Sequence, residues 1–257
     1  MNTGRRGVIP SSLFYSNRFT FFMELDTIRY LTEGLWQALI LIVSFDREVY
    51  RIVLTSLYCS VTATFLGSAI ALPLGFFIGG FEFRGKASLV TIFNTLMALP
   101  TTVVGLMGYS LLSRKGPLGF LGLLFTPWAV ILGETILCIP IITSFAISVT
   151  QGIDSKVRET SLTLGASPMQ SYLAVVREGR IGYLVAIVAG YARVVAEVGA
   201  AMMLGGNIRG FTRTIPTAIM LETSKGEFAL GIALGIILIF LAFSINIILH
   251  RLRALGE

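Results

Sequence analysis

Five long apolar runs constrain this chain more than any other feature of its sequence. Each run is long enough to cross the hydrocarbon core of a bilayer, which takes about 20 helical residues. Membrane-spanning β-strands are shorter and alternate apolar with polar residues, a pattern that these runs lack. We place the runs at about Ile52–Gly80, Ala87–Ser113, Trp128–Thr150, Tyr183–Leu204 and Phe228–His250. The sequence therefore predicts an all-α polytopic membrane protein, with one transmembrane domain over residues 34–252.

The composition supports the membrane assignment and limits the classes of function that the chain can have. Of the 257 residues, 54% are hydrophobic and 13% are charged, whereas soluble domains carry roughly 25% charged residues. The net charge of +6 is spread over the loops, which indicates contact with lipid headgroups or an anionic solute and gives no reason to invoke nucleic acid. Cys59 and Cys138 lie within apolar runs and are expected to be packing residues. Because we find no metal-ligand cluster and no nucleophile–base pair, we predict no metal, no cofactor and no enzymatic activity.

The two ends of the chain are less informative. Residues 1–33 form an N-terminal extension whose first part lacks the apolar core and cleavage site of a signal peptide, so the native start could be Met23 rather than Met1. The segment Leu35–Phe45 is apolar, too short to span and bounded by charged residues, and we expect it to be a helix lying in the membrane interface. The alternative is a sixth span with strained ends. Residues 253–257 are expected to be a short tail.

A polar segment, residues 151–182, separates the third apolar run from the fourth. Asp154 can cap a helix over Ser155–Leu164, and Gly165 can end that helix in a left-handed turn. Ser167 and Pro168 are a typical cap and first residue of a second helix. The segment therefore predicts a helix–turn–helix elbow that protrudes from the membrane. Its apolar side chains indicate a protein partner, and the alternative is that they rest on the bilayer or on the chain's own bundle.

This elbow resembles the cytoplasmic coupling loop of ABC importer permeases. The family's loop has Glu-Ala-Ala followed by Gly, and here Glu159 is followed by Thr160 and Ser161, with Gly165 at the glycine position. The resemblance implies that the 154–178 loop docks on a separate ATPase subunit through Glu159, Thr160, Ser161, Gly165, Ala166 and Ser167. Arg177-Glu178 stands where the family usually has Leu-Pro, so the exit of the second helix departs from the pattern.

The coupling loop also orients the chain, which charge counting does not. Lys and Arg are distributed almost evenly between the two sets of loops, so the excess that marks cytoplasmic loops is missing. The resemblance implies that the elbow and the C-terminus are cytoplasmic, with the N-terminus outside a cell membrane that the chain crosses several times.

Four further segments extend the resemblance over most of the chain. They are similar to signatures of molybdate and tungstate permeases, the last one to the tungstate branch in particular: 94–105, 193–200, 205–219 and 221–230. The resemblance implies a type I ABC importer bundle of about five core transmembrane helices with an N-terminal interfacial helix. It also implies that the chain is the transmembrane subunit of an ATP-driven importer of a tetrahedral oxyanion. Tungstate is the first candidate substrate, and molybdate or sulfate is the alternative.

The same resemblance implies the partners. They are a second copy of the chain, which completes the translocation pathway, two copies of an ABC ATPase, an extracytoplasmic oxyanion-binding protein and the lipid bilayer. A transporter that works without ATP is the alternative from another class. That class is built from inverted internal repeats, which we do not find in this sequence.

Two charged residues fall inside the fourth run, where charge is costly. Arg193 and Glu197 are four residues apart, and a charge at the bilayer centre costs at least ~2.5–3.5 kcal/mol on insertion scales, so we expect the two to pair inside the bundle. The pair either fixes the helix rotation or helps to gate a central pathway. Pro100 and Thr101 in the second run are assigned to the same pathway, because proline can supply a bend. Glu134 is expected to be a hydrogen-bonded structural acid.

The segment after the fourth run combines glycines with Asn207, Arg209 and Arg213. Two guanidinium groups and free amides suit a tetrahedral oxyanion. They equally suit acidic residues on a delivering protein, which we favour because capture by a permease should be weak. This segment is therefore a candidate outer-face contact.

Glycine patterns give two weaker signals. Residues 80–87 nearly match a phosphate-binding loop, but Ala87 replaces the hydroxyl residue and the segment follows a membrane helix, so we predict a short turn and no ATP site. Gly75-x-x-x-Gly79 and Gly231-x-x-x-Gly235 both permit close helix approach. The sequence does not distinguish between these two pairs.

Overall fold

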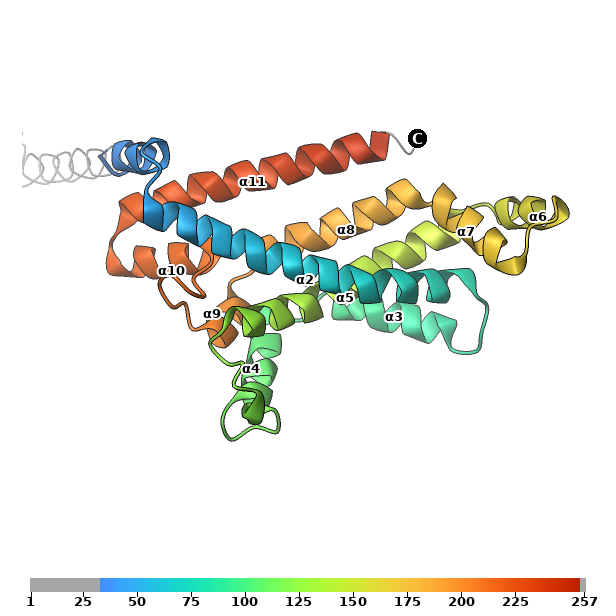
Figure 1. Ribbon diagram of the computed structural model, residues 1–257, viewed down its shortest axis with the longest axis horizontal. Helices are drawn as coiled ribbons and strands as arrows, with labels where there is room; N and C mark the ends of the chain where they lie inside the picture. The colour runs from blue at the N-terminus through green and yellow to red at the C-terminus, as the bar shows by residue number, and fades with distance from the viewer. Residues whose placement is uncertain (1–32, 255–257) are drawn as a thin grey trace, which may run out of the picture.

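The computed structural model describes residues 33–254, and every regular element in that range is a helix (Figure 1). A first helix, Glu33–Val43, precedes α2. The others are α2 (Arg47–Gly80), α3 (Lys86–Leu96), α4 (Thr101–Leu112), the short 3-10 helix η1 (Gly119–Leu121), α5 (Pro127–Gly152), α6 (Ser155–Thr163), α7 (Pro168–Glu178), α8 (Arg180–Val195), α9 (Gly199–Gly205), α10 (Ile215–Lys225) and α11 (Phe228–Ala254). The choice between Met1 and Met23, and the last residues of the tail, fall outside the described range.

Three of the five predicted spans are single continuous helices. They are α2, α5 and α11, each long and apolar enough to cross a membrane. The helix Glu33–Val43 is apolar but too short to span, as expected for residues 35–45. The all-α membrane fold predicted from the sequence is therefore confirmed.

The other two predicted spans are broken, which the sequence analysis did not anticipate. The run Ala87–Ser113 consists of α3 and α4, which meet at an angle of 94°. Pro100 stands at this break as the cap of α4, because proline has no N–H to continue a helix and its ring keeps the preceding residue out of the helical region. The run Tyr183–Leu204 consists of α8 and α9, bent by 62°.

The centre of the bundle is the long contact between α2 and α5. Glycines of α2 let the two backbones come close: a Cβ atom on Gly75 would lie 2.9 Å from the carbonyl oxygen of Thr143, and one on Gly79 would lie 2.7 Å from the Cβ of Thr150. Gly235 on α11 has no such neighbour, because nothing lies within 4 Å of its added Cβ. Of the two glycine pairs, the one on α2 therefore makes the closer helix–helix contact, since an added Cβ on Gly231 would lie 3.4 Å from Thr223 of α10.

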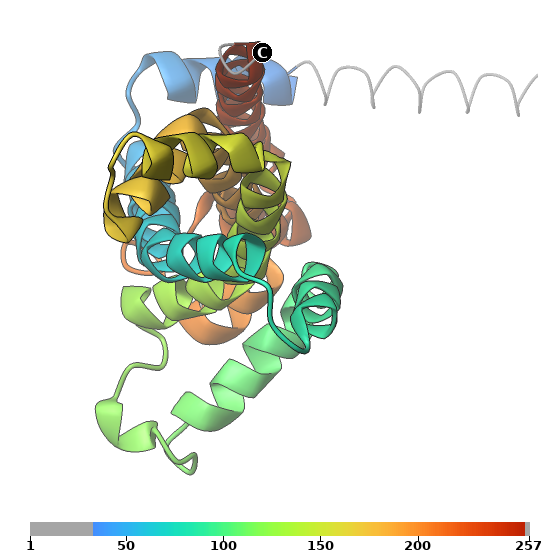
Figure 2. The ribbon, with the colours of Figure 1, turned by 90° about the vertical axis from the view of Figure 1, so that its right-hand side faces the viewer.

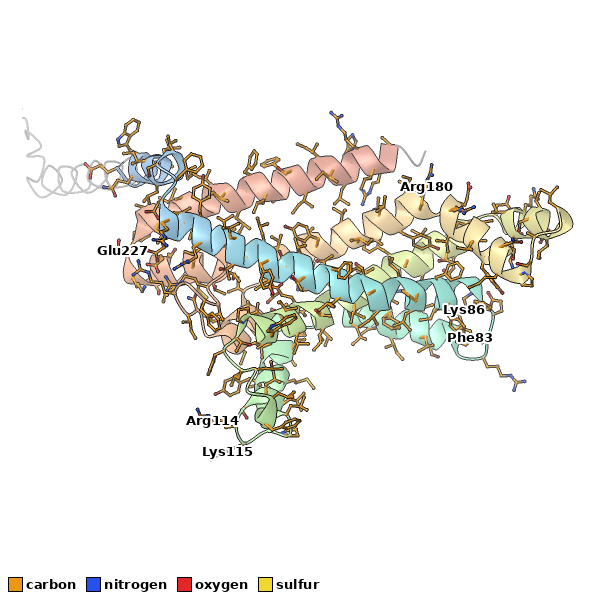
Figure 3. All side chains as sticks on the ribbon, in the orientation of Figure 1. Phe83, Lys86, Arg114, Lys115, Arg180 and Glu227 are labelled. Atoms are coloured by element: carbon orange, nitrogen blue, oxygen red, sulfur yellow. The ribbon has the colours of Figure 1, made fainter. Side chains whose placement is uncertain are left out.

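The connecting segments gather at opposite ends of the bundle. One end carries the α2–α3 turn, the α6–α7 elbow and the C-terminus, and the other carries α10 and the start of α2 (Figure 1). The labelled side chains show the same division, with Phe83, Lys86 and Arg180 at one end and Glu227 at the other (Figure 3). In Figure 2, α4 and the loop after it project away from the other helices. The start of α2 and the end of α11 therefore lie at opposite ends of the bundle (Figure 1).

Candidate functional site

The predicted elbow is present and its capping follows the sequence. The side chain of Asp154 accepts a hydrogen bond from the backbone N–H of Lys156, so α6 begins at Ser155. Gly165 has φ +89° between α6 and α7, a conformation that side chains other than glycine disfavour. Ser167 and Gln170 form a capping box at the start of α7, with Pro168 in the first helical position. These local interactions fix the angle between the two helices.

One aromatic side chain fastens the elbow to the bundle. The ring of Tyr172 on α7 packs against Phe76 at 6.1 Å and Phe81 at 5.2 Å between centroids, both at the end of α2. The guanidinium of Arg158 on α6 lies 4.9 Å from the centre of the same ring, a cation–π contact. Both elbow helices therefore share one anchor on α2. The sequence analysis did not single out this anchor, because Phe76 and Phe81 lie more than ninety positions from Tyr172.

The outer face of the elbow is apolar and uncovered in the isolated chain. Leu164 is 82% exposed, and Met169 and Leu173 are also exposed. Glu159, Thr160 and Gly165 are also exposed, and Glu159 lines a cavity between the elbow and the α2–α3 turn. Large apolar side chains that are exposed together on one unit are typical of a protein-binding site. The structure thus brings the predicted coupling residues together on one protruding unit.

Gly165→Ala tests whether the left-handed turn holds the elbow together. Nothing lies within 4 Å of an added Cβ, so the substitution introduces backbone strain without a clash. We expect the elbow to lose about 1–2 kcal/mol, which hydrogen–deuterium exchange should detect as faster exchange of residues 155–178. The control is Gly152→Ala, which has equal space and no left-handed backbone. Equal exchange in the two variants would contradict the role of Gly165.

The breaks of the two bent spans lie against each other. A Cβ on Gly199, the first residue of α9, would lie 2.8 Å from the side-chain oxygen of Thr101 at the start of α4. One turn further along, a Cβ on Gly105 would lie 3.0 Å from the Cα of Ala200. Pro100 and Thr101 from one span therefore meet the start of α9 from the other. The sequence analysis assigned Pro100 and Thr101 to the same pathway as Arg193 and Glu197. It did not foresee the contact between α4 and α9.

Arg193 and Glu197 lie 3.8 Å apart between charged atoms, but only Glu197 is inside the bundle as expected, because the Arg193 side chain is 42% exposed. Glu197 does not continue the helix of Arg193, because α8 ends at Val195 and Glu197 lies in the break before α9. One carboxylate oxygen of Glu197 accepts a hydrogen bond from the backbone N–H of Ala200, at 3.1 Å. The buried carboxylate therefore ties the end of α8 to the first turn of α9.

Two other predictions about buried residues have different outcomes. Glu134 was expected to be hydrogen-bonded, but its Oε2 atom is buried without a hydrogen-bond partner among the residues that the structure describes. Cys59 and Cys138 are free and buried in α2 and α5, as expected for packing residues. The near match to a phosphate-binding loop is the α2–α3 turn, where Lys86 binds Glu82 at 2.6 Å and the carbonyl of Gly79 at 3.1 Å.

At the opposite end of the molecule, ion pairs connect α2 to the segment between α9 and α11. Arg209 pairs with Glu48, which raises the pKa of the Arg209 guanidinium. Arg213 lies 3.6 Å from Glu48 and 3.1 Å from Glu222, and Lys225 lies 3.1 Å from Glu222. Neither acid was a candidate from the sequence, because Glu48 and Arg209 are 161 positions apart. We call these five residues the outer cluster.

The three predicted outer-face residues differ in exposure. The side chain of Arg209 is 73% exposed, whereas that of Arg213 is 8% exposed. Asn207 is buried in a left-handed conformation, and its amide donates to the carbonyl of Thr217 at 3.1 Å. Arg209 and Arg213 also line a cavity of about 540 Å³, together with Arg47 and Arg51 at the start of α2. Arg209 is thus the residue of the three that faces outward.

Known proteins resemble this chain over nearly its whole length. The family model described as the binding-protein-dependent transport system inner membrane component matches residues 71–254. The tungstate uptake system permease protein TupB of Peptoclostridium acidaminophilum is 38% identical over 226 residues, covering 88% of this chain and 99% of that protein. The protein of the same name from Campylobacter jejuni subsp. jejuni serotype O:2 is 42% identical over 224 residues, covering 87% and 94%.

Solved structures agree on the fold. A chain of the inward-facing MetNI methionine ABC transporter superposes with a TM-score of 0.66 at 19% identity, covering 82% of this chain and 97% of that one. A chain of a bacterial alginate ABC transporter has a TM-score of 0.63 at 18% identity, covering 96% of each chain. The fold is therefore that of a type I ABC importer permease, a multi-pass membrane protein. Together with the matched family model, this shows that the chain belongs to the family of binding-protein-dependent transport system inner membrane components.

Proposed function

We propose that this chain is the transmembrane subunit of an ATP-driven importer of tungstate, with molybdate as the second candidate substrate. The observation that carries the proposal is the α6–α7 elbow, which presents exposed apolar side chains at one end of the bundle (Figure 1). Two relatives at 38% and 42% identity that bear the name of a tungstate uptake permease support the substrate. The molybdenum transport system permease ModB of Escherichia coli strain K12, at 28% identity over 214 residues, supports the second candidate.

The elbow is the proposed contact with the ATPase subunit. Glu159 and the exposed residues from Thr160 to Ser167 would dock in its surface, which places this end of the bundle in the cytoplasm and the N-terminus outside. Motion of the docked elbow reaches the bundle by two routes. Tyr172 transmits it to α2 through Phe76 and Phe81, and Gly179 joins α7 directly to α8.

Two copies of the chain, each bound to an ATPase subunit, would enclose the pathway between them. The contact between the two broken spans is our candidate for its gate, because bent helices can reposition at their breaks. Pro100 and Thr101 contribute one side of that contact, and the Arg193–Glu197 pair holds the break on the other side. Pairing with Arg193 also reduces the repulsion that the carboxylate of Glu197 would exert on an oxyanion.

The opposite end of the bundle would receive the delivering protein from outside. Arg209 is exposed and offers a cation to acidic residues of that partner. Asn207 and Arg213 are buried, and they hold the same segment in place from within. The outer segment thus combines one contact residue with two residues that support it.

Glu159→Arg tests the proposed function. Glu159 is exposed and makes no ion pair among the described residues, so charge reversal should leave folding and membrane insertion intact. We expect the ATPase subunit to copurify poorly, and tungstate uptake into cells, measured as cell-associated tungsten, to fall at least tenfold. Glu227→Arg makes the same reversal at the other end of the bundle (Figure 3) and should leave copurification unchanged.

Three results would reject parts of this proposal. Normal copurification and uptake in Glu159→Arg would reject the elbow as the coupling site. Uptake that persists without the ATPase subunit would favour a transporter that works without ATP. If a small excess of molybdate abolished tungstate uptake, molybdate would be the better substrate.

A further inference from the structure

An apolar groove runs between α2 and α8 beside the elbow. Its walls are formed by Leu72 and Phe76 of α2, Val176 of α7, and Leu184 and Ile187 of α8. Its volume of about 510 Å³ lies within the range of roughly 300–1,000 Å³ that is usual for small-molecule sites. Because α2 and α8 belong to predicted spans, the groove lies at the depth of lipid tails near one membrane surface.

One charged side chain stands at the end of this groove. Arg180 is the first residue of α8, where α8 meets α7, and it lines the groove while remaining exposed. Figure 3 shows it at the end of the bundle that carries the elbow. It makes no ion pair with any residue in the part of the chain that the structure describes. The groove therefore has an apolar body and a single unpaired cation at its membrane-surface end.

We propose that this groove binds one anionic phospholipid, with an acyl chain along the apolar walls and the phosphate on the guanidinium of Arg180. A guanidinium binds a phosphate through two parallel hydrogen bonds, and cationic side chains near a membrane surface attract anionic headgroups. The apolar walls of the groove suit the acyl half of a lipid, and a free phosphate ion would leave them unused. The cationic end and the apolar walls of the groove therefore both fit an anionic phospholipid.

The proposed lipid also touches the coupling elbow. Val176 belongs to α7, whereas the opposite wall belongs to α2, so an acyl chain between them would brace the elbow against the bundle. Tyr172 makes the other contact between the same two helices. An anionic lipid in the groove would therefore add to the attachment of the elbow.

Native mass spectrometry of the full-length chain with its ATPase subunit tests the proposal. The complex is titrated with phosphatidylglycerol or with phosphatidylcholine of identical acyl chains. We expect phosphatidylglycerol to be retained about fivefold more, the preference that one cation near the membrane surface provides. Arg180→Gln should remove the preference, and Leu184→Trp, which fills the groove from an exposed position, should reduce retention of both lipids. Arg177→Gln, a nearby arginine outside the groove lining, should behave as the unmodified chain.

The alternatives give distinct results that overturn the proposal. An unchanged preference in Arg180→Gln would place the anionic lipid elsewhere. Displacement of phosphatidylglycerol by millimolar inorganic phosphate would show that the groove contributes nothing to binding. Disulfide-linked dimers of a Leu184→Cys variant would identify a second copy as the occupant, since both native cysteines are buried. Thermal melts of each variant in phosphatidylcholine alone confirm that it is folded.

Discussion

Gly75→Leu should prevent the chain from accumulating as a folded protein. Gly75 lies where α2 crosses α5, and an added Cβ would come within 2.9 Å of the carbonyl oxygen of Thr143 and into contact with Ala146. The first neighbour is helix backbone, which cannot move aside as a flexible side chain can. Overpacking a core costs about 1–3 kcal/mol and sometimes more, and we expect at least the upper end of that range at the main helix contact of the bundle. Gel filtration of the fluorescently tagged chain in detergent should show little monodisperse protein.

Gly235→Leu is the matched control for this prediction. Gly235 occupies the second position of the other glycine pair, in α11, and nothing lies within 4 Å of its added Cβ. Leucine there should leave the monodisperse yield within about twofold, because the side chain extends into open space. Similar losses in both variants would mean that the contact between α2 and α5 is not what makes Gly75 necessary.

The two glycine pairs also show what this sequence does and does not determine. Both have the same spacing in equally apolar surroundings, so the sequence alone gave them the same interpretation. The difference lies in their neighbours: α5 follows α2 across the whole bundle, whereas α11 lies at its side and is mostly uncovered. Which helices meet depends on the packing of the complete chain, and local spacing does not encode it.

The elbow could be predicted almost to the residue because its determinants are local. Asp154, Gly165, Ser167 and Pro168 act on backbone groups within three positions of themselves. Hydropathy likewise located the three continuous spans and the two bent helix pairs, since it depends only on length and composition. It did not reveal the two breaks, because an apolar run has the same hydropathy whether straight or bent. Pro100 was a usable signal for the first break, and the second, at residues 196–198, has no comparable marker.

The outer cluster could not be predicted as a whole because Glu48 lies 161 positions from Arg209, and because sequence spacing does not show that Glu222 folds back onto Arg213. Arg209 and Arg213 were interpreted as contacts for an oxyanion or, as the favoured alternative, for acidic residues of a delivering protein, and both interpretations assume unpaired cations. Glu48 comes from the start of α2 and Glu222 from α10, and together they supply the carboxylates that neutralise these arginines. A cation that has buried acidic partners supports the fold first, and only its exposed neighbours remain available to other molecules.

Glu222→Leu should strongly destabilise the folded chain, because it removes a carboxylate that neutralises the buried Arg213. Glu222 and Arg213 are 6% and 8% exposed and lie 3.1 Å apart, so removing the carboxylate leaves a buried guanidinium with only the longer contact to Glu48, at 3.6 Å. Breaking one side of a buried ion pair costs about 3–5 kcal/mol. We expect a loss of that size in the free energy of unfolding, measured by denaturation of the purified chain in mixed micelles.

Two further variants separate the buried pair from charge in general. Glu82→Leu breaks the ion pair with Lys86, in which the Glu82 side chain is 89% exposed, and should cost less than about 1 kcal/mol because water screens that pair. Arg213→Met combined with Glu222→Leu removes both buried charges, and an apolar replacement of a buried pair is often neutral, so stability should largely return. If the double variant were as unstable as Glu222→Leu alone, the loss would come from packing rather than from an unpaired arginine. Recovery in the double variant would show that the buried charge of Arg213 is tolerated only because of its acidic partners.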